Sequence, residues 1–149
     1  MTTTTSPLLL QVQGLRTVFE TRAGRVFAVD GVDVAVNPGE CLGVVGESGA
    51  GKSTIGNAIM GLIEPPGELS GGRIALDGNE IQNLPPTQMR KLRGRRIGMI
   101  FQDPMSSLNP LMTVGEQIIE TICQHLHMSR QEARVRAIDL LRDVDIPDP

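Results

Sequence analysis

One eight-residue segment constrains the fold of this chain more than any other feature. Residues 46–53, GESGAGKS, match the phosphate-binding pattern G-x-x-x-x-G-K-[ST] at every fixed position. The glycines explain the spacing, because they let the backbone curl until successive N–H groups point at one anion. The pattern is meaningful only where a strand precedes it and a helix follows it. The chain is therefore expected to contain a strand–loop–helix unit of an α/β protein.

The flanking residues fit that expectation. Residues 41–45, CLGVV, form a short continuous apolar run, which is typical of a strand buried on both faces. A helix is predicted from Ser53 to Ile63, and residues 64–67, EPPG, would end it. A helix that begins at the loop directs the positive end of its dipole toward a bound phosphate.

The side chains of the loop predict its ligands. Lys52 would place a positive charge near the β- and γ-phosphates of a nucleotide, and the Ser53 hydroxyl would ligate Mg²⁺. We therefore expect ATP and Mg²⁺ to bind here. The residues expected to bind ATP at this loop are Gly46, Glu47, Ser48, Gly49, Ala50, Gly51, Lys52, Ser53 and Thr54.

Composition argues against nucleic-acid binding. The formal net charge of −3 is unfavourable for sequence-independent binding to a phosphate backbone. With three Phe, no Trp and no Tyr, the chain also lacks an aromatic platform on which bases could stack. The one basic cluster is interpreted as a solvated helix face and its exit. Its members are Arg90, Lys91, Arg93, Arg95 and Arg96.

Nothing in the sequence predicts secretion or a membrane span. The first 13 residues lack the basic start and long apolar core of a signal peptide. The longest apolar runs are about five residues, far short of the ~20 that span a bilayer. Cys41 and Cys123 lie far apart and match neither metal-ligand spacing nor a disulfide framework. We expect a reducing compartment, with any membrane role exerted from the cytoplasmic side through partners.

Periodicity predicts the remaining elements, after a disordered tail at residues 1–7. Strands are predicted at 8–15, 26–36, 41–45, 71–76 and 97–101, and an Asp77-Gly78 turn is expected to close the strand at 71–76. Helices are predicted at 53–63, 86–94, 113–127 and from 129 onward. The last two helices begin with capping boxes, Thr113-x-x-Glu116 and Ser129-x-x-Glu132.

Three stretches resemble the ATP-binding subunits of ABC transporters. Residues 45–54, VGESGAGKST, resemble the Walker A motif of that family, and residues 28–40, AVDGVDVAVNPGE, are similar to the strand segment and turn before it. Residues 97–118, IGMIFQDPMSSLNPLMTVGEQI, resemble the Q-loop region of the dipeptide, oligopeptide and nickel importer branch. The resemblance runs from about Leu8 to Pro149. It implies an α/β fold, the N-terminal part of a P-loop NTPase of the ABC type.

The resemblance assigns roles beyond the P-loop. Gln102 is similar to the Q-loop glutamine, which contacts Mg²⁺ and the attacking water and couples the site to the membrane subunits. A side-chain amide suits this role because its carbonyl can coordinate a cation. The implied catalytic residues are Lys52 and Gln102, and the implied metal ligands are Ser53 and Gln102. The loop Asp103–Pro110 would lie near the transmembrane coupling helices.

The family also stacks adenine on an aromatic side chain that precedes the Walker A motif. The nearest position by alignment is Ala23, so this chain departs from the pattern there. Phe19 is the candidate for adenine stacking. Phe27 lies inside a predicted strand and is expected to pack in the core.

One segment imitates another family motif. Residues 69–73, LSGGR, spell most of the ABC signature LSGGQ. The signature follows the Q-loop in the family, whereas this segment precedes Gln102. We therefore interpret Gly71–Ile74 as part of a strand.

The resemblance further predicts an incomplete domain. Residues 8–111 would be part of the RecA-like core, and residues 112–149 the start of the helical subdomain. The signature motif, the Walker B Asp with its catalytic Glu, and the switch His all lie farther along in the family. His125 and His127 do not match the switch position. The chain is expected to be truncated before the signature motif and to be inactive or nearly so by itself.

Together these features predict the ATP-binding subunit of an ABC importer, an ATPase in its full-length form, for peptides, nickel or related small solutes. Its expected partners are a second nucleotide-binding subunit, two permease subunits met through Asp103–Pro110 and, indirectly, a solute-binding protein. It would lie peripherally on the cytoplasmic face of the cell membrane. Two alternatives stay open. One is a small P-loop kinase, in which the segment Gln102–Pro110 would have no role. The other is a non-transport ABC ATPase, which that segment and the net negative charge of the chain disfavour.

Overall fold

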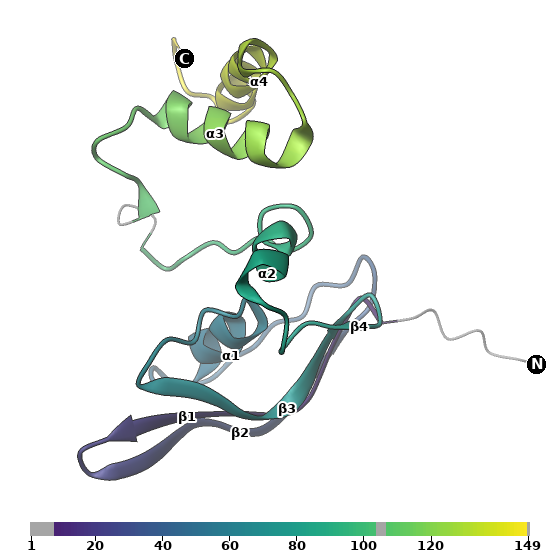
Figure 1. Ribbon diagram of the computed structural model, residues 1–149, viewed down its shortest axis with the longest axis vertical. Coiled ribbons are helices and arrows are strands. Elements are labelled where there is room, and N and C mark those ends of the chain that lie inside the picture. Colours follow the sequence, from purple (N-terminus) through teal and green to yellow (C-terminus); the bar gives the residue numbers. More distant parts are fainter. Residues whose placement is uncertain (1–7, 104–106, 149) are drawn as a thin grey trace, which may run out of the picture. The chain divides into compact units, whose positions relative to one another are not determined.

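The computed structural model describes residues 8–103 and 107–148. The predicted tail at residues 1–7 and part of the loop Asp103–Pro110 lie outside the described residues. The chain forms two units, Met1–Arg90 and Lys91–Pro149 (Figure 1). The predicted division into a core part, 8–111, and a helical part, 112–149, stays a prediction.

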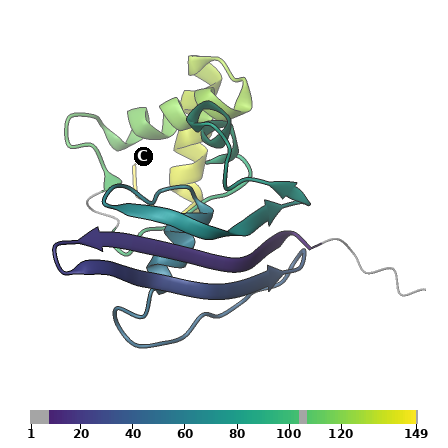
Figure 2. The same cartoon turned by 60° about the horizontal axis from the view of Figure 1, so that its bottom comes forward.

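The first unit is built on a four-stranded antiparallel sheet in the order β2-β1-β3-β4. Its strands are β1 (Leu10–Thr21), β2 (Gly24–Val36), β3 (Gly67–Leu76) and β4 (Asn79–Glu80). Figure 2 shows β1, in purple, between β2 and β3. The strands predicted at 8–15, 26–36 and 71–76 are confirmed, and β1 and β3 extend beyond their predicted bounds.

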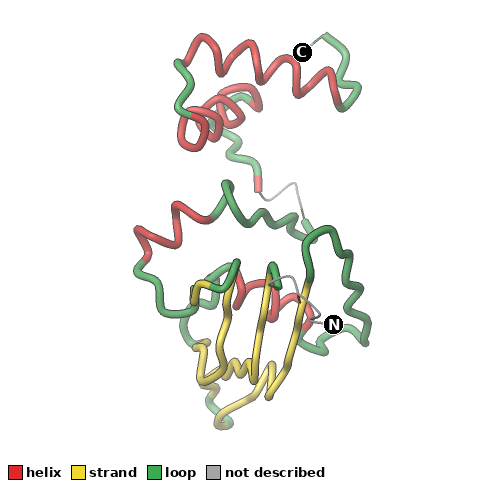
Figure 3. Tube along the Cα trace, turned by 90° about the vertical axis from the view of Figure 1, so that its right-hand side faces the viewer, coloured by secondary structure: helices red, strands yellow, loops and turns green. Residues whose placement is uncertain are grey.

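The core of this unit forms where the sheet meets the helix α1 (Lys52–Ile59). Helix α1 contacts β1 and β2 (Figure 3). The buried side chains of β1 include Val12, Leu15 and Val18, each at most 1% exposed, and α1 contributes Ala58. Full burial of such a Val or Leu side chain stabilises a fold by about 1.5–3 kcal/mol. The core of this unit is therefore built from aliphatic side chains.

The segment that imitates the ABC signature lies in β3, as interpreted. Gly72 has a φ of +100°, and a Cβ added to it would lie 2.6 Å from the Leu15 Cα and 2.8 Å from the Gly14 carbonyl oxygen. No other residue fits so close to the backbone of β1. The second glycine of this segment thus serves strand packing.

Two predicted strands are wrong. Residues 41–45 and 97–101 form no strand, and most of their side chains are exposed, with Val45 at 93% and Ile100 at 95%, although Ile97 and Met99 are half-buried. A parallel strand needs hydrogen-bonding neighbours and cover on both faces. In the part of the chain that the structure describes, neither segment has a strand partner in the sheet. An apolar run alone therefore does not produce a strand.

Predictions that rest on short turn and helix patterns agree better with the structure than these two strand predictions. Asp77 and Gly78 have φ values of +48° and +75° and link β3 to β4, as a two-residue hairpin turn requires. Helix α2 spans Pro86–Leu92 and is slightly shorter than predicted.

The second unit contains the helical pair α3 (Val114–Leu126) and α4 (Arg130–Asp143). Both predicted capping boxes are formed. The pair buries Ile119 and Ile122 of α3 against Ala133 and Ala137 of α4. The small alanines let the two helices approach closely. No helix among residues 8–103 and 107–148 has the length and apolar character needed to cross a membrane.

Candidate functional site

The phosphate-binding loop, residues 46–51, leads directly into α1. Gly49 and Gly51 have φ values of +84° and +83°, and Gly51 is the N-cap of the helix. Such left-handed angles cost residues with a Cβ about 1–2 kcal/mol. The Ala50 N–H donates to the Glu47 carbonyl at 3.2 Å and so closes a turn inside the loop. The predicted curl of the backbone around the glycines is therefore present.

The end of this loop lies against the backbone of β2. A Cβ added to Gly51 would lie 2.3 Å from the Ala28 carbonyl oxygen and 3.5 Å from the Val29 Cγ2 atom. Val29 is itself buried, at 4% exposed. The sheet therefore fixes where α1 begins, which is the point at which a bound anion would be held. The sequence around the loop carries no sign of this contact, because Ala28 comes from a distant strand.

The Lys52 side chain folds back over the loop. Its Nζ donates hydrogen bonds to the carbonyl oxygens of Gly46 at 2.8 Å and Glu47 at 2.6 Å. Among the residues that the structure describes, no carboxylate forms an ion pair with Lys52. Two neutral carbonyls leave the positive charge uncompensated, and an ammonium has a third N–H to donate. The Lys52 side chain is thus placed at the loop as a phosphate ligand must be.

The first turn of α1 is also open to an anion. Its N-cap, Gly51, has no side chain to accept from the helix N–H groups, and the turn holds no acidic residue. The positive end of the helix dipole is therefore not offset by a side chain. The Ser53 side chain is exposed, and Thr54 is half-buried. A glycine cradle, an ammonium and an exposed hydroxyl fit a phosphate chain with Mg²⁺.

The two phenylalanines considered for adenine stacking differ in their surroundings. The Phe19 ring of β1 lies over Gly67 of β3, where an added Cβ would stand 2.6 Å from the Phe19 Cε1 atom. Phe19 is half-buried, and its role in stacking stays a prediction. Phe27 is 53% exposed, so its expected packing in the core is wrong. Its strand, β2, lies at the edge of the sheet, and the adjacent Val26 is exposed as well, at 51%.

Gln102 belongs to the second unit and is exposed. Its predicted contacts with Mg²⁺ and water stay predictions. Asp103 is described beside it, whereas residues 104–106 of the predicted permease loop lie outside the described residues.

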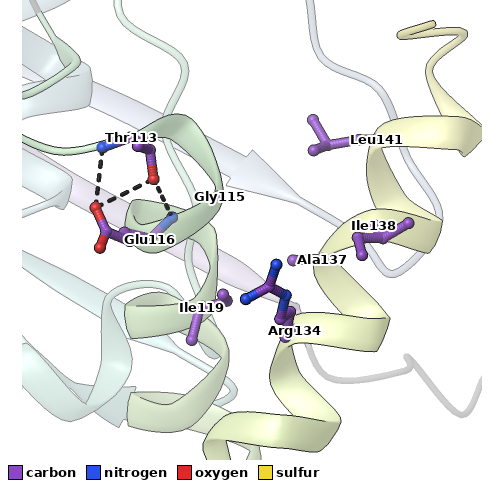
Figure 4. Close-up of a pocket in the computed structure, with 8 residues that line it drawn as sticks. All are labelled: Thr113, Gly115, Glu116, Ile119, Arg134, Ala137, Ile138 and Leu141. Carbon is purple, nitrogen blue, oxygen red and sulfur yellow. Dashed lines mark hydrogen bonds between the residues drawn. The ribbon is translucent and has the colours of Figure 1, made fainter. Parts of the chain in front are cut away.

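A pocket of about 340 Å³ lies between α3 and α4. Figure 4 shows Thr113 and Glu116 at the start of α3, and Arg134 reaching from α4 into the space between the helices. Its walls are otherwise largely apolar, with Ile119 and Leu141 among the lining residues. No residue predicted to bind ATP lines this pocket, and it has no glycine cradle. The candidate site therefore remains the loop at residues 46–54.

Comparisons with known proteins identify one family for this chain. A family model described as "ABC transporter" matches residues 29–149. The chain is 47% identical to the oligopeptide transport ATP-binding protein OppD of Bacillus subtilis over 95% of its own length. It is 46% identical to OppD of Escherichia coli and 45% identical to the dipeptide transport ATP-binding protein DppD of Escherichia coli. These likenesses favour the ABC transporter family over a small P-loop kinase.

Solved structures agree with the fold. The chain is similar to the dimeric ATP-binding cassette MJ0796 in a post-hydrolysis state bound to ADP and Pi, with a TM-score of 0.81 and 25% identity. That match covers 93% of this chain and 58% of the other. The chain spans about two fifths of the length of its OppD and DppD relatives: 40% and 41% for the two OppD proteins and 43% for DppD.

Proposed function

Since this chain belongs to the ABC transporter family, we propose that it forms the nucleotide-binding part of an ATP-driven importer subunit. One observation carries the proposal: the loop at residues 46–51 curls around an open helix N-terminus while Lys52 folds over it. That arrangement offers backbone donors, a dipole and a full positive charge to one anion.

The proposed solutes are peptides. The support is that relatives 45–47% identical to this chain are named as oligopeptide or dipeptide transport ATP-binding proteins. Nickel or related small solutes are the alternative within the same importer branch.

Each group at the proposed site would have a different role in binding ATP, Mg²⁺ or water. Backbone N–H groups of residues 46–51 bind phosphate oxygens, and Lys52 exchanges a carbonyl contact for one of them. The Ser53 hydroxyl holds Mg²⁺, which neutralises charge on the phosphates when bound. Gln102 orients the attacking water and senses the state of the site, and Phe19 stacks on adenine.

The proposed assembly contains a second nucleotide-binding subunit, two permease subunits and an external solute-binding protein. The similarity to a dimeric cassette supports pairing between nucleotide-binding subunits. The loop Asp103–Pro110 would meet the permeases at the cytoplasmic face of the membrane.

ATP affinity tests the proposed site. Lys52→Ala should weaken ATP binding by about 10–150-fold, because it removes a charge-assisted hydrogen bond worth roughly 1.5–3 kcal/mol. Equilibrium dialysis of the purified chain with Mg-ATP measures this change. Lys91→Ala is the matched control, since Lys91 is the only other lysine and is exposed. Equal ATP affinity in both variants would show that the loop does not bind the nucleotide.

A further inference from the structure

Gly67 of β3 lies against the ring of Phe19. A Cβ added to Gly67 would lie 2.6 Å from the Phe19 Cε1 atom and 3.0 Å from both Cδ1 and Cζ, the two ring atoms bonded to Cε1. A point in the plane of the ring, outside Cε1, would be clearly farther from those two atoms than from Cε1. The nearly equal distances therefore place the added Cβ over one face of the ring, where only a glycine leaves the ring in its position.

The backbone itself does not require a glycine at position 67. The φ of Gly67 lies outside the left-handed region, in contrast to Gly72 of the same strand, which has a φ of +100°. Residues with a Cβ could adopt that conformation without strain. The missing side chain at position 67 is thus explained by the ring that lies over it.

Hydrogen bonds fix the backbone on both sides of this contact. The Gly67 N–H donates to the Glu64 carbonyl oxygen at 2.8 Å, and the Glu20 N–H donates to the Pro66 carbonyl oxygen at 3.1 Å. Phe19 and Gly67 are also direct partners in the register of β1 and β3. The backbone that carries the ring and the backbone that supports it are therefore held together.

The Phe19 side chain lies on the face of the sheet against which the phosphate-binding loop ends. Val29 of β2 lies close to Gly51 at the end of that loop and is the register partner of Thr17 on β1. Partners in register point their side chains to the same face of a sheet. Thr17 and Phe19 are two residues apart, with no register shift toward β3 between them, so their side chains share that face too.

We propose that Gly67 is a positioning residue: it supports one face of the Phe19 ring, so that the opposite face is presented to the adenine base of ATP. The inference rests on the proposed function, in which Phe19 stacks on adenine. Phe19 is half-buried, so its ring keeps exposed surface for a base. A ring that is already held in place loses less freedom when the base binds, which favours binding.

Inorganic tripolyphosphate, which has a phosphate chain but no base, separates stacking from phosphate binding. Gly67→Ala should weaken Mg-ATP binding about fivefold, the lower end of what one base–aromatic stack contributes, because the ring must move away from the added Cβ. Tripolyphosphate binding, measured by the same equilibrium dialysis, should not change. Equal weakening of both ligands would show a general structural role for Gly67 and would overturn the proposal.

Gly71→Ala is the matched control. Gly71 lies in the same strand, its φ is also outside the left-handed region, and an added Cβ meets only Arg16 side-chain atoms, at 3.8 Å. Its affinity for ATP and for tripolyphosphate should equal that of the unaltered chain. If Gly71→Ala weakens ATP binding as much as Gly67→Ala does, the contact with the ring is not the cause and the proposal fails.

A double variant tests whether Gly67 acts through the ring. Phe19→Ala alone should weaken ATP binding about 5–100-fold, because the stack is lost. In that background Gly67→Ala should cause no further loss, since no ring is left to support. A loss of the same size with and without Phe19 would overturn the assignment.

The unaltered chain provides a test that does not depend on the folding of any variant. Nuclear Overhauser contacts between the Phe19 ring and the Gly67 Hα protons should persist when Mg-ATP is added, and new contacts should join the ring to adenine protons. Loss of the Gly67 contact on ATP binding would overturn the proposal.

These measurements also distinguish failure of the inference from failure of the proposed function. If ATP and tripolyphosphate bind equally well and Phe19→Ala changes neither affinity, the inference fails and the proposed phosphate site stands. If neither ligand binds, or Lys52→Ala changes neither affinity, the proposed function fails and the inference fails with it.

Discussion

Two loops of this chain are held by different means. The phosphate-binding loop, residues 46–51, takes its shape mainly from glycine angles and from a close approach to Ala28 of β2, and Lys52 binds two of its carbonyl oxygens. The turn Asn109–Met112 takes its shape from side-chain amides that bind its backbone.

The difference follows from what each loop must leave free. A loop that binds phosphate has to keep most of its N–H groups available, so glycine angles and packing should fix it more than hydrogen bonds from its own N–H groups do. Within residues 46–51 the Ala50 N–H is in use, at 3.2 Å from the Glu47 carbonyl oxygen. The backbone of the turn Asn109–Met112 has no ligand assigned to it, so its N–H and carbonyl groups can be used in hydrogen bonds with side chains. The difference between these two segments can therefore be tested by asking which interactions hold each one.

The largest expected effect comes from Gly51→Ala. Alanine there adds backbone strain of about 1–2 kcal/mol and a clash with Ala28 of about 1–3 kcal/mol, so the free energy of unfolding should fall by about 3 kcal/mol. Urea unfolding followed by far-UV circular dichroism suits the measurement, because the chain has no Trp and no Tyr.

Gly49→Ala is the matched control for that substitution. Gly49 has nearly the same φ, +84°, but an added Cβ meets nothing within 4 Å. Its cost should be strain alone, about 1–2 kcal/mol. Equal costs for the two substitutions would show that contact with β2 does not fix the phosphate-binding loop.

A smaller effect is expected at the start of α3. Thr113→Ala removes the N-cap oxygen that accepts from the Glu116 N–H at 3.2 Å, which should cost about 1 kcal/mol. Because the Gln117 side chain rather than Thr113 accepts from the Asn109 N–H, at 3.0 Å, the Asn109 amide should keep its protection against hydrogen exchange. Ser129→Ala removes the equivalent cap of α4 at a similar cost. Loss of Asn109 protection in Thr113→Ala alone would mean that the cap, not the amide, holds the turn.

The smallest effect concerns pH. Hydrogen bonds from the Thr113 backbone and side chain lower the pKa of Glu116 below its ordinary 4.5, and bonds from the Ser129 side chain and backbone lower the pKa of Glu132 in the same way. A lowered folded-state pKa means that the stabilisation is present above about pH 4.5 and is lost as pH falls through the folded pKa. Helicity of α3 and α4 should therefore decrease slightly below that pH, whereas the phosphate-binding loop has no capping carboxylate to titrate.

Carboxyl chemical shifts of Glu116 and Glu132, followed by NMR against pH, measure these pKa values directly. In Thr113→Ala the pKa of Glu116 should rise only part of the way to its ordinary value, because the backbone N–H of residue 113 still donates to the carboxylate, while the pKa of Glu132 stays low. An unchanged pKa of Glu116 in Thr113→Ala would show that the Thr113 hydroxyl does not contribute to lowering it.

Local signals in the sequence determined a large part of this protein. The glycine-lysine pattern at residues 46–53, the Asp77-Gly78 turn and the two capping boxes all concern groups a few residues apart. Neighbours in sequence are neighbours in space whatever the rest of the chain does, so these predictions needed no tertiary information. The ABC family resemblance drew on the same short segments.

Only the tertiary structure decided which segments meet distant partners. It left the apolar runs 41–45 and 97–101 without strand partners and placed Gly72 against β1. It also set Gly51 against Ala28 and exposed Phe27 at the sheet edge. Residues far away in the chain decide whether a segment forms a strand, whether a side chain is buried and where two backbones come close. Periodicity in the sequence specifies that a face is apolar, but it does not specify which residues cover that face.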